Sequence, residues 1–295
     1  MNAHLVASAR DPLRLKHIPR SFSYDLGAYL DICRVAGNDE RATLSRAVSR
    51  INTILSSVNP QVLIANSTMD PINRLWIKSG ELRNIKTVCL QHGVYGSAIP
   101  DFAQEEDIVD RYIALDEAQY GIVARNIDKR KIECLGAPAS FVWSPPACGL
   151  KICFVGEDWE RYGYFDLKRE IIDIYRDVAQ ALYLFGIKDV FYKPHPSEKQ
   201  FLGIFDVMKK LSSDATHIPD VYIGFSSSLL RDMASKGKLA IQVHDQSAGI
   251  DNFQSRGYCI SFDKNSDFIN QILLSVAHAQ EVPCVRERAL EEFLL

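Results

Sequence analysis

The residues best suited to chemistry follow short apolar runs, at points where β-strands would end. In "DVFYKPHPSE" (189–198), an apolar run leads into Lys193, Pro194, His195 and Pro196. Each proline fixes its own φ and restrains the preceding residue, so Lys193 and His195 are both held extended. A cation and an imidazole presented in this way suit a phosphate ligand or a phosphate leaving group. A turn that merely contains a histidine is the alternative interpretation.

Three consecutive serines follow another apolar run, in "VYIGFSSSLLRD" (221–232). One of Ser226, Ser227 and Ser228 suffices to cap the predicted helix that begins here. The remaining hydroxyls, the free N–H groups of the first turn and the helix dipole suit an anion. If the two strand ends are adjacent, the serines and His195 predict a phosphate clamp, while a plain helix cap remains the alternative.

Candidate general bases follow two further apolar runs. Glu157 and Asp158 come directly after "LKICFVG" (150–156), and His92 comes directly after "KTVCLQ" (86–91). Each could deprotonate an acceptor hydroxyl. A surface or capping carboxylate and a structural histidine are the alternatives, and the choice of base stays open. Asp245 and Asp251, near the end of another strand, could bind ribose hydroxyls.

Two series of alternating strands and helices position these residues. Strands are predicted at 61–66, 86–91, 111–116, 131–136, 150–156, 189–193, 220–224, 238–243 and 257–262, and helices at 39–58, 70–82, 117–126, 166–185, 198–211, 228–236 and 266–279. Such alternation predicts parallel sheets with right-handed crossovers. The proline-rich segment 137–149 predicts a linker between domains 1–143 and 144–295. We therefore expect an α/β chain with two Rossmann-like domains facing a cleft, and ligands beyond the carboxyl ends of the strands.

Composition excludes several classes of protein. The 295 residues are 47% hydrophobic and carry a net charge of −3, which is typical of a soluble globular protein without a basic field for nucleic acid. Seven cysteines without a CxxC pair indicate a reducing cytosol and neither a disulfide framework nor a zinc site. A P-loop and a GxGxxG fingerprint are absent, and no metal site is expected. The locally basic N-terminal stretch 1–20 predicts either a solvated arm or a peripheral contact with the inner face of the membrane.

Three of these segments resemble motifs of known enzymes. "KPHP" and "GFSSSL" resemble the HP and serine motifs of bacterial sialyltransferases and related CMP-sugar transferases, which have the GT-B fold. CDP-glycerol glycerophosphotransferases of the teichoic-acid type are nearly as similar. "LQHGVYG" (90–96) resembles the QHG element of bacterial surface-polysaccharide transferases.

The resemblance implies a function and roles for the residues named above. His195 would contact the CMP phosphate and donate a proton to it, and Ser226, Ser227 and Ser228 would hold the same phosphate. The family's base lies in an acidic-acidic-Gly motif, whereas "GED" (156–158) has its glycine first. The N-terminal domain would bind the acceptor and the C-terminal domain the nucleotide sugar.

We accordingly expect a metal-independent glycosyltransferase that needs no cofactor. It would transfer a nonulosonic-type sugar (sialic acid, Kdo or a relative) from a CMP-activated donor to a bacterial surface glycan. The catalytic candidates are His195, Glu157, Asp158 and His92, and the donor-binding candidates are Lys193 and the three serines. Alternatives are a polyol-phosphate transferase using CDP-glycerol or CDP-ribitol, a non-catalytic nucleotide-binding or scaffold protein and, more distantly, a UDP-sugar epimerase-like GT-B enzyme. The sequence does not determine the oligomeric state.

Overall fold

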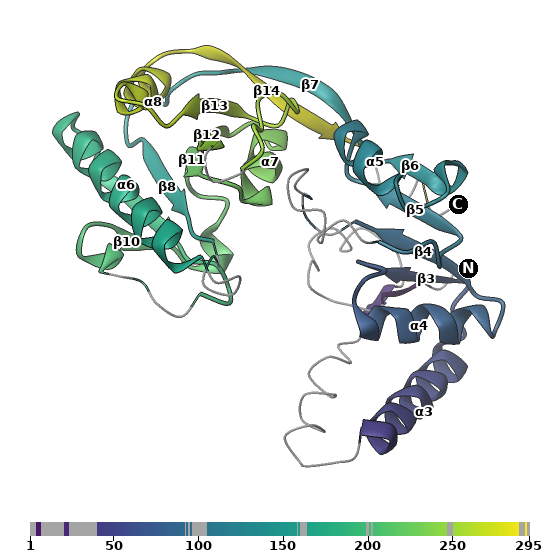
Figure 1. Cartoon of the computed structure of the whole chain (residues 1–295). Coiled ribbons are helices and arrows are strands. Elements are labelled where there is room, and N and C mark those ends of the chain that lie inside the picture. The colour runs from purple at the N-terminus through teal and green to yellow at the C-terminus, as the bar shows by residue number, and fades with distance from the viewer. Residues whose placement is uncertain are drawn as a thin grey trace. The chain divides into compact units, whose positions relative to one another are not determined.

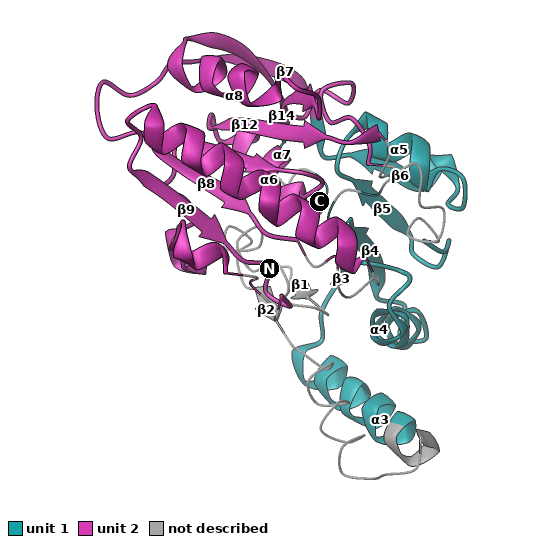
Figure 2. Cartoon of the chain, turned by 60° about the vertical axis from the view of Figure 1, so that its left-hand side comes forward, with its two compact units in different colours: residues 1–95, 99–136, 287–295 teal, residues 96–98, 137–286 magenta. Residues whose placement is uncertain are grey.

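The computed structural model describes residues 4–6, 21–23, 40–91, 93, 95, 105–157, 159, 164–198, 201, 203–246, 250–288 and 293. The chain divides into two units, coloured separately in Figure 2. Unit 1 comprises residues 1–95, 99–136 and 287–295, and unit 2 comprises residues 96–98 and 137–286. The chain thus changes unit after Gly136 and again after Arg286, whereas the boundary predicted from the sequence follows Trp143, the last residue of a strand.

Unit 1 contains a six-stranded sheet in the order β2-β1-β3-β4-β5-β6, in which all described neighbours are parallel. Its strands are β1 (His4–Val6), β2 (Ser21–Ser23), β3 (Val62–Ala65), β4 (Lys86–Leu90), β5 (Arg111–Ala114) and β6 (Ile132–Cys134), and its helices are α3 (Glu40–Val58), α4 (Pro71–Glu81), α5 (Glu117–Val123) and the 3-10 turn η2 (Lys129–Lys131). The last four strands and the three α-helices confirm the sequence prediction. Strands β1 and β2 are not among the predicted strands.

Helix starts in unit 1 follow ordinary capping chemistry. Asp70 accepts hydrogen bonds from the N–H groups of Ile72 and Asn73, and Pro71 occupies the first helical position of α4. Asp116 caps α5 by accepting from Gln119 N–H at 3.0 Å. The caps fix where each helix leaves the carboxyl end of the preceding strand.

Unit 2 contains a second six-stranded sheet, in the order β10-β9-β8-β11-β12-β13, again with parallel neighbours. Its strands are β8 (Lys151–Val155), β9 (Asp189–Lys193), β10 (Lys209–Lys210), β11 (Val221–Gly224), β12 (Leu239–His244) and β13 (Ile260–Asp263), and its helices are α6 (Phe165–Leu184), α7 (Ser228–Ser235), α8 (Phe268–Ala277) and the 3-10 turns η4 (Ile204–Asp206) and η5 (Ser213–Ala215). Strands β7 (Gly136–Trp143) and β14 (Gln280–Glu287) pair as a separate two-stranded sheet.

Two predictions for unit 2 are wrong. Strands β9 and β11 are not adjacent, because β8 lies between them in the sheet. The helix predicted at 198–211 is absent from its described residues, because Gly203 adopts a left-handed φ of 69° and the chain continues as η4 and β10. The segment 137–149, expected to mark a linker or domain boundary, begins within strand β7, and the chain changes unit at its start.

The core of unit 2 lies between the sheet and its helices. Helix α6 runs alongside β8 in Figure 1 and buries an apolar face that includes Ile171, Tyr175 and Val178. Tyr175 packs against Phe154 of β8 at a ring-centroid distance of 4.8 Å and donates a hydrogen bond to Val155 O at 2.9 Å. Burial of these rings fixes α6 on the sheet face and brings its first turn to the carboxyl end of β8.

The described helices include none with both the length and the apolar character that crossing a bilayer would require.

Candidate functional site

His195 lies just beyond the carboxyl end of β9, on the surface of unit 2. Its ring Nδ1 lies 3.3 Å from the backbone N–H of Ser197, which donates to it, and 2.7 Å from Ser197 Oγ. Because Nδ1 accepts from a backbone donor, the neutral ring carries its proton on Nε2. The loop therefore fixes one tautomer, with a hydrogen-bond donor at the outer nitrogen.

A buried carboxylate holds the backbone of His195. Glu198 Oε2 accepts the His195 N–H at 3.1 Å, and His195 O accepts the Glu198 N–H at 3.0 Å. Glu198 Oε1 also lies 3.1 Å from Lys168 Nζ of α6 and accepts from the Tyr192 hydroxyl at 2.8 Å. The Lys168 and Glu198 side chains are 3% and 0% exposed, so this is a fully buried ion pair.

Lys168 and Glu198 were not predicted from the sequence to contribute to this site. A signal for Lys168 exists, since it occupies one helical stripe with Ile171, Ile172 and Tyr175, all buried. A lysine within an apolar stripe needs a buried partner. Nothing in the sequence marks Glu198 as buried, because a glutamate after "KPHPS" is typical of an exposed turn.

Lys193 is the last residue of β9 and is partly buried. Burial lowers the pKa of its ammonium, and the neighbouring Cys153 thiol acts in the opposite direction. Among the described residues, no side chain or backbone group forms a hydrogen bond or an ion pair with the Lys193 ammonium. A partly desolvated cation of this kind gains from an anionic ligand.

Glu157 lies just beyond β8 and places its carboxylate at the N-terminus of α7. Oε1 accepts the N–H groups of Phe225, Ser226 and Ser227 at 3.1, 2.7 and 3.1 Å, and Oε2 accepts the Ser226 hydroxyl. Burial raises the pKa of Glu157, and the hydrogen bonds from Ser226, Phe225 and Ser227 partly offset that rise. The Glu157 carboxylate thus occupies backbone N–H groups that were predicted from the sequence to bind a phosphate.

The other two serines differ from Ser226. Ser227 is the N-cap of α7 and accepts the Leu229 N–H at 3.3 Å, as one serine was expected to do. Ser228 follows as the first helical residue, and within the described part of the chain neither its N–H nor its hydroxyl has a hydrogen-bond partner. Ser228 is therefore the serine whose donors remain open to a ligand.

Gln242 fixes this turn from the next strand. Its amide donates to Phe225 O at 2.6 Å and to Asp251 O at 2.8 Å, and its Oε1 accepts the Phe253 N–H at 2.7 Å. The side chain is fully buried in β12. One amide thereby joins the start of α7 to the 251–253 loop, which was not predicted from the sequence.

The structure brings some of the predicted site residues together. Glu157 contacts Ser226 and Ser227, whereas His195 contacts Ser197. At a strand spacing of about 4.8 Å, β9 and β11 are about 10 Å apart with β8 between them. A phosphate that touches both strand ends would have to lie across the end of β8.

Other predicted residues stand apart from this group. Asp158 and His92 lie outside the described residues. Asp245 forms an ion pair with Lys264 at 3.0 Å, and Asp251 forms one with Arg256 at 2.7 Å. Both carboxylates considered for ribose binding are therefore engaged within the protein.

Unit 1 has its own polar cluster at the carboxyl ends of β4 and β5. Gln91 donates to Gly93 O at 3.0 Å and to Gln119 Oε1 at 2.6 Å. Gln119 also accepts the Tyr95 N–H at 2.8 Å and donates to Tyr95 O at 3.2 Å. Two buried glutamines thus hold the described backbone of the QHG segment, and Gln119 was missed because it lies on a separate helix.

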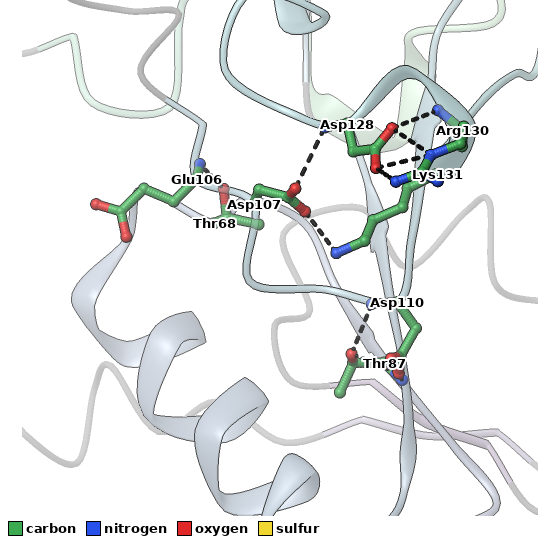
Figure 3. Close-up of polar contacts among 8 residues, drawn as sticks. All are labelled: Thr68, Thr87, Glu106, Asp107, Asp110, Asp128, Arg130 and Lys131. Atoms are coloured by element: carbon green, nitrogen blue, oxygen red, sulfur yellow. Dashed lines mark hydrogen bonds and ion pairs between the residues drawn. The ribbon is translucent and has the colours of Figure 1, made fainter.

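The segment after residue 104 is tied to the same edge of unit 1. Buried Glu105 accepts the Thr68 N–H at 2.5 Å and the Tyr95 hydroxyl. Figure 3 shows the continuation, in which the Glu106 N–H donates to Thr68 Oγ1 at 2.6 Å and Asp110 pairs with Thr87. Glu105 thus holds the side chain of Tyr95, while Gln119 holds its backbone.

A cavity of about 460 Å³ opens at the other edge of the unit 2 sheet. Its lining includes Asp220 and Lys238, which precede β11 and β12, and Trp143, the last residue of β7. It contains none of the predicted site residues, and the phosphate chemistry considered above does not involve it.

Comparisons with known proteins bear on the fold. No protein-family model matches the chain, and no curated protein matches it by sequence. UDP-GlcNAc 2-epimerase from Methanocaldococcus jannaschii superposes with a TM-score of 0.57 at 10% identity, covering 93% of this chain and 92% of that one. A putative UDP-N-acetylglucosamine 2-epimerase from Listeria monocytogenes gives 0.56 at 9% identity over 88% and 74%. The enzyme from Neisseria meningitidis, bound to UDP-GlcNAc, gives 0.53 at 9% identity over 82% of both chains.

The chain has the GT-B fold. The predicted fold class is therefore confirmed. Identities of 9–10% establish the GT-B fold alone and transfer no activity. Any activity of this GT-B chain has to be argued from its own residues.

Proposed function

We propose that this GT-B chain is a glycosyltransferase whose nucleotide-sugar donor binds, through its phosphate, at the carboxyl edge of the unit 2 sheet. The observation that carries the proposal is the fixed tautomer of His195, whose Nδ1 accepts the Ser197 N–H. The proton on Nε2 can then be donated to a phosphate oxygen. Lys193 and Ser228 supply further donors, and neither has a partner among the described residues.

The chemistry follows from where charge develops. The bond between the anomeric carbon and the phosphate oxygen breaks, and the electron pair stays on the departing phosphate. Hydrogen-bond donors fixed at that oxygen stabilise the transition state more than the ground state. His195 would hold or transfer its Nε2 proton there, while the acceptor hydroxyl attacks the anomeric carbon and loses its proton to a base.

Glu157 fits the role of that base poorly. Three backbone N–H groups and the Ser226 hydroxyl already occupy its oxygens. We assign it instead to the α7 N-terminus as an internal anion, and we leave the general base to Asp158 or His92. Both lie outside the described residues, and in the sequence Asp158 comes three residues after β8 and His92 two residues after β4.

The HP and serine motifs support a CMP-activated sugar as donor, with a nonulosonic-type sugar and a surface-glycan acceptor. Among the described residues around the site, the charges of Lys193 and Glu157 offset one another, and the Lys168–Glu198 pair is internally neutral. A CMP-nonulosonate carries one charge on its phosphodiester and one on its sugar carboxylate, so the donor assignment rests on the motifs and not on the charge of the site.

Two other donors compete with this assignment. CDP-glycerol or CDP-ribitol would use the same motifs with a diphosphate, and the enzyme would then transfer a polyol phosphate. A UDP-sugar is the third option, because the Neisseria meningitidis structure of the same fold holds UDP-GlcNAc.

A ligand screen tests the donor. Melting temperatures would be measured with CMP, CDP, UDP and GDP over a concentration series, since a ligand at 100 times its Kd stabilises by about 2.7 kcal/mol. We expect CMP to give the largest shift at equal concentration, and CMP release from CMP-sialic acid or CMP-Kdo with a glycan acceptor. A larger shift with CDP or UDP, together with turnover of CDP-glycerol alone, would overturn the CMP assignment.

His195→Ala separates an enzyme from a non-catalytic nucleotide-binding protein. We expect this variant to lose about 100-fold or more of the CMP-release rate, in line with loss of a general acid. His217→Ala is the matched control, because His217 is an exposed histidine of the same unit that contacts no predicted site residue. Equal activity of both variants would exclude the catalytic role of His195.

A further inference from the structure

Glu198 joins the His195 loop to the interior of unit 2. Its carboxylate receives the Lys168 ammonium, the Tyr192 hydroxyl and the His195 N–H, at 3.1, 2.8 and 3.1 Å. All three are donors, so the carboxylate acts purely as an acceptor. Two of them belong to the interior of unit 2, and the third belongs to the loop that carries the candidate acid.

The flanking prolines make the His195 N–H unusual. Pro194 and Pro196 have no N–H group, so His195 offers the one backbone donor in the 194–196 segment. Glu198 accepts that donor and returns its own N–H to His195 O at 3.0 Å. The prolines restrict the backbone torsions, and this pair of hydrogen bonds ties the His195 backbone to the buried Glu198.

The end of β8 is shaped around the same carboxylate. A Cβ at Gly156 would lie 2.6 Å from Glu198 Oε2 and 2.5 Å from the Tyr192 hydroxyl oxygen. The Gly156 N–H meanwhile donates to Lys193 O at 2.7 Å. Glycine at this position therefore lets β8 and the His195 loop approach as closely as the ion pair requires.

A buried ion pair is a costly way to fill this space. Desolvation of two charges can cancel their attraction, and well-packed apolar residues of similar size are often as stable. An apolar pair in place of Lys168 and Glu198 would, however, leave no acceptor for the His195 N–H. The Lys168–Glu198 pair holds the His195 backbone in place, whereas apolar packing would contribute only to stability.

We propose that Glu198, held by Lys168, is a positioning residue that keeps the His195 ring at the donor phosphate. This inference rests on the proposed function of His195. The new element is that the tautomer and the position of the His195 ring depend on a hydrogen-bond acceptor at position 198. The Lys168 charge is needed only to compensate the Glu198 charge in the interior.

The test compares two full-length variants in one background. Lys168→Met/Glu198→Gln removes both charges and keeps an oxygen that can accept the His195 N–H, whereas Lys168→Met/Glu198→Leu removes the acceptor. Urea unfolding confirms that both are folded. Asp220→Asn is the matched control, because Asp220 accepts the Lys151 N–H at 3.0 Å at the opposite edge of the same sheet.

Calorimetric titration with CMP is the first measurement. We expect the Gln variant to bind within about threefold of the unmodified protein and the Leu variant about tenfold more weakly, the effect of one misplaced hydrogen bond. Adding His195→Ala to the Leu variant should weaken binding no further. Equal binding by the Gln and Leu variants, or a fully additive loss with His195→Ala, would overturn the positioning role.

Nitrogen-15 spectra of histidine-labelled protein give a readout that does not need CMP. The signals of His195 are identified by their absence in His195→Ala, among the seven histidines of the chain. The Gln variant should retain an unprotonated Nδ1, and the Leu variant should show a mixture of tautomers. If the unmodified protein binds no CMP, the proposed function fails, and these spectra still decide whether Glu198 positions the ring.

Discussion

Removing the Lys168 charge should destabilise unit 2 far more than removing both charges of its pair. Lys168 Nζ and Glu198 Oε1 are 3.1 Å apart with side chains 3% and 0% exposed. At an effective dielectric constant of about 20, their attraction is about 5 kcal/mol. Lys168→Met leaves the Glu198 carboxylate buried without its counter-ion, which typically costs about 3–5 kcal/mol.

The expected cost of Lys168→Met is near the lower end of that range. Two hydrogen bonds to Glu198, from the Tyr192 hydroxyl and the His195 N–H, survive the substitution and partly compensate the charge. Lys168→Met/Glu198→Gln should cost only about 1 kcal/mol, because it removes both charges and retains an acceptor. The coupling energy between the two positions should therefore exceed about 2 kcal/mol.

Urea unfolding followed by tryptophan fluorescence measures these costs. The chain has three tryptophans, and Trp76 is the one in unit 1. A Trp76→Phe background confines the signal to Trp143 and Trp159 of unit 2, so the transition of that unit can be fitted alone. Trp76 suits replacement because its indole N–H is buried and lacks a partner within the described structure.

Two results would refute the reasoning. If Lys168→Met shifts the midpoint no more than the double variant does, the carboxylate is not held as a buried charge. If the two single substitutions add without coupling, the pair does not interact as its geometry requires. A change in m without a change in midpoint would instead indicate that a variant altered the unfolded or partly folded state.

Three further predictions concern the same edge of unit 2. Gly156→Ala should cost about 2–3 kcal/mol in urea unfolding through overpacking against Tyr192 and Glu198, and an unchanged midpoint would contradict the close approach. Ser227→Ala should lower the free energy of unfolding by about 1 kcal/mol, because α7 loses its N-cap. Ser228→Ala should lower the affinity for CMP and leave the melting temperature nearly unchanged. Because burial raises the pKa of Glu157, its contribution to stability is complete below its unfolded pKa and is lost as pH rises through the raised folded value. Glu157→Gln should therefore flatten the fall in melting temperature as pH rises above the ordinary glutamate range. A profile parallel to that of the unmodified protein would refute the assignment.

Strands and most helices could be predicted from the sequence because their signals are local. Short strand-forming runs such as 189–193 and 221–224 alternate with amphipathic stretches, and both periods are set by backbone geometry. The helix predicted at 198–211 shows the limit of this reasoning. Its apolar spacing suits a helix, but Gly203 adopts a left-handed φ, and Ile204, Met208 and Leu211 are buried from η4 and from the residues on either side of β10.

The order of strands was beyond the sequence. Nothing in "KPHPSE" or "GFSSSL" states that β8 separates the two strands that precede them. Sheet order depends on which crossovers bury the most apolar surface, a property of the whole unit. The sequence correctly identified residues at strand ends, but the prediction that they meet on adjacent strands was wrong.

The α/β class, the strand ends and the restrained backbone of His195 follow from the sequence alone, because each depends on residues next to one another in the chain. The contact of Glu157 with the start of α7 and the hold of Glu198 and Lys168 on His195 emerge from the folded structure. The Glu157–Ser226 and Lys168–Glu198 contacts join residues 30 or more positions apart through burial, and a buried charge finds its partner only after the sheet has formed.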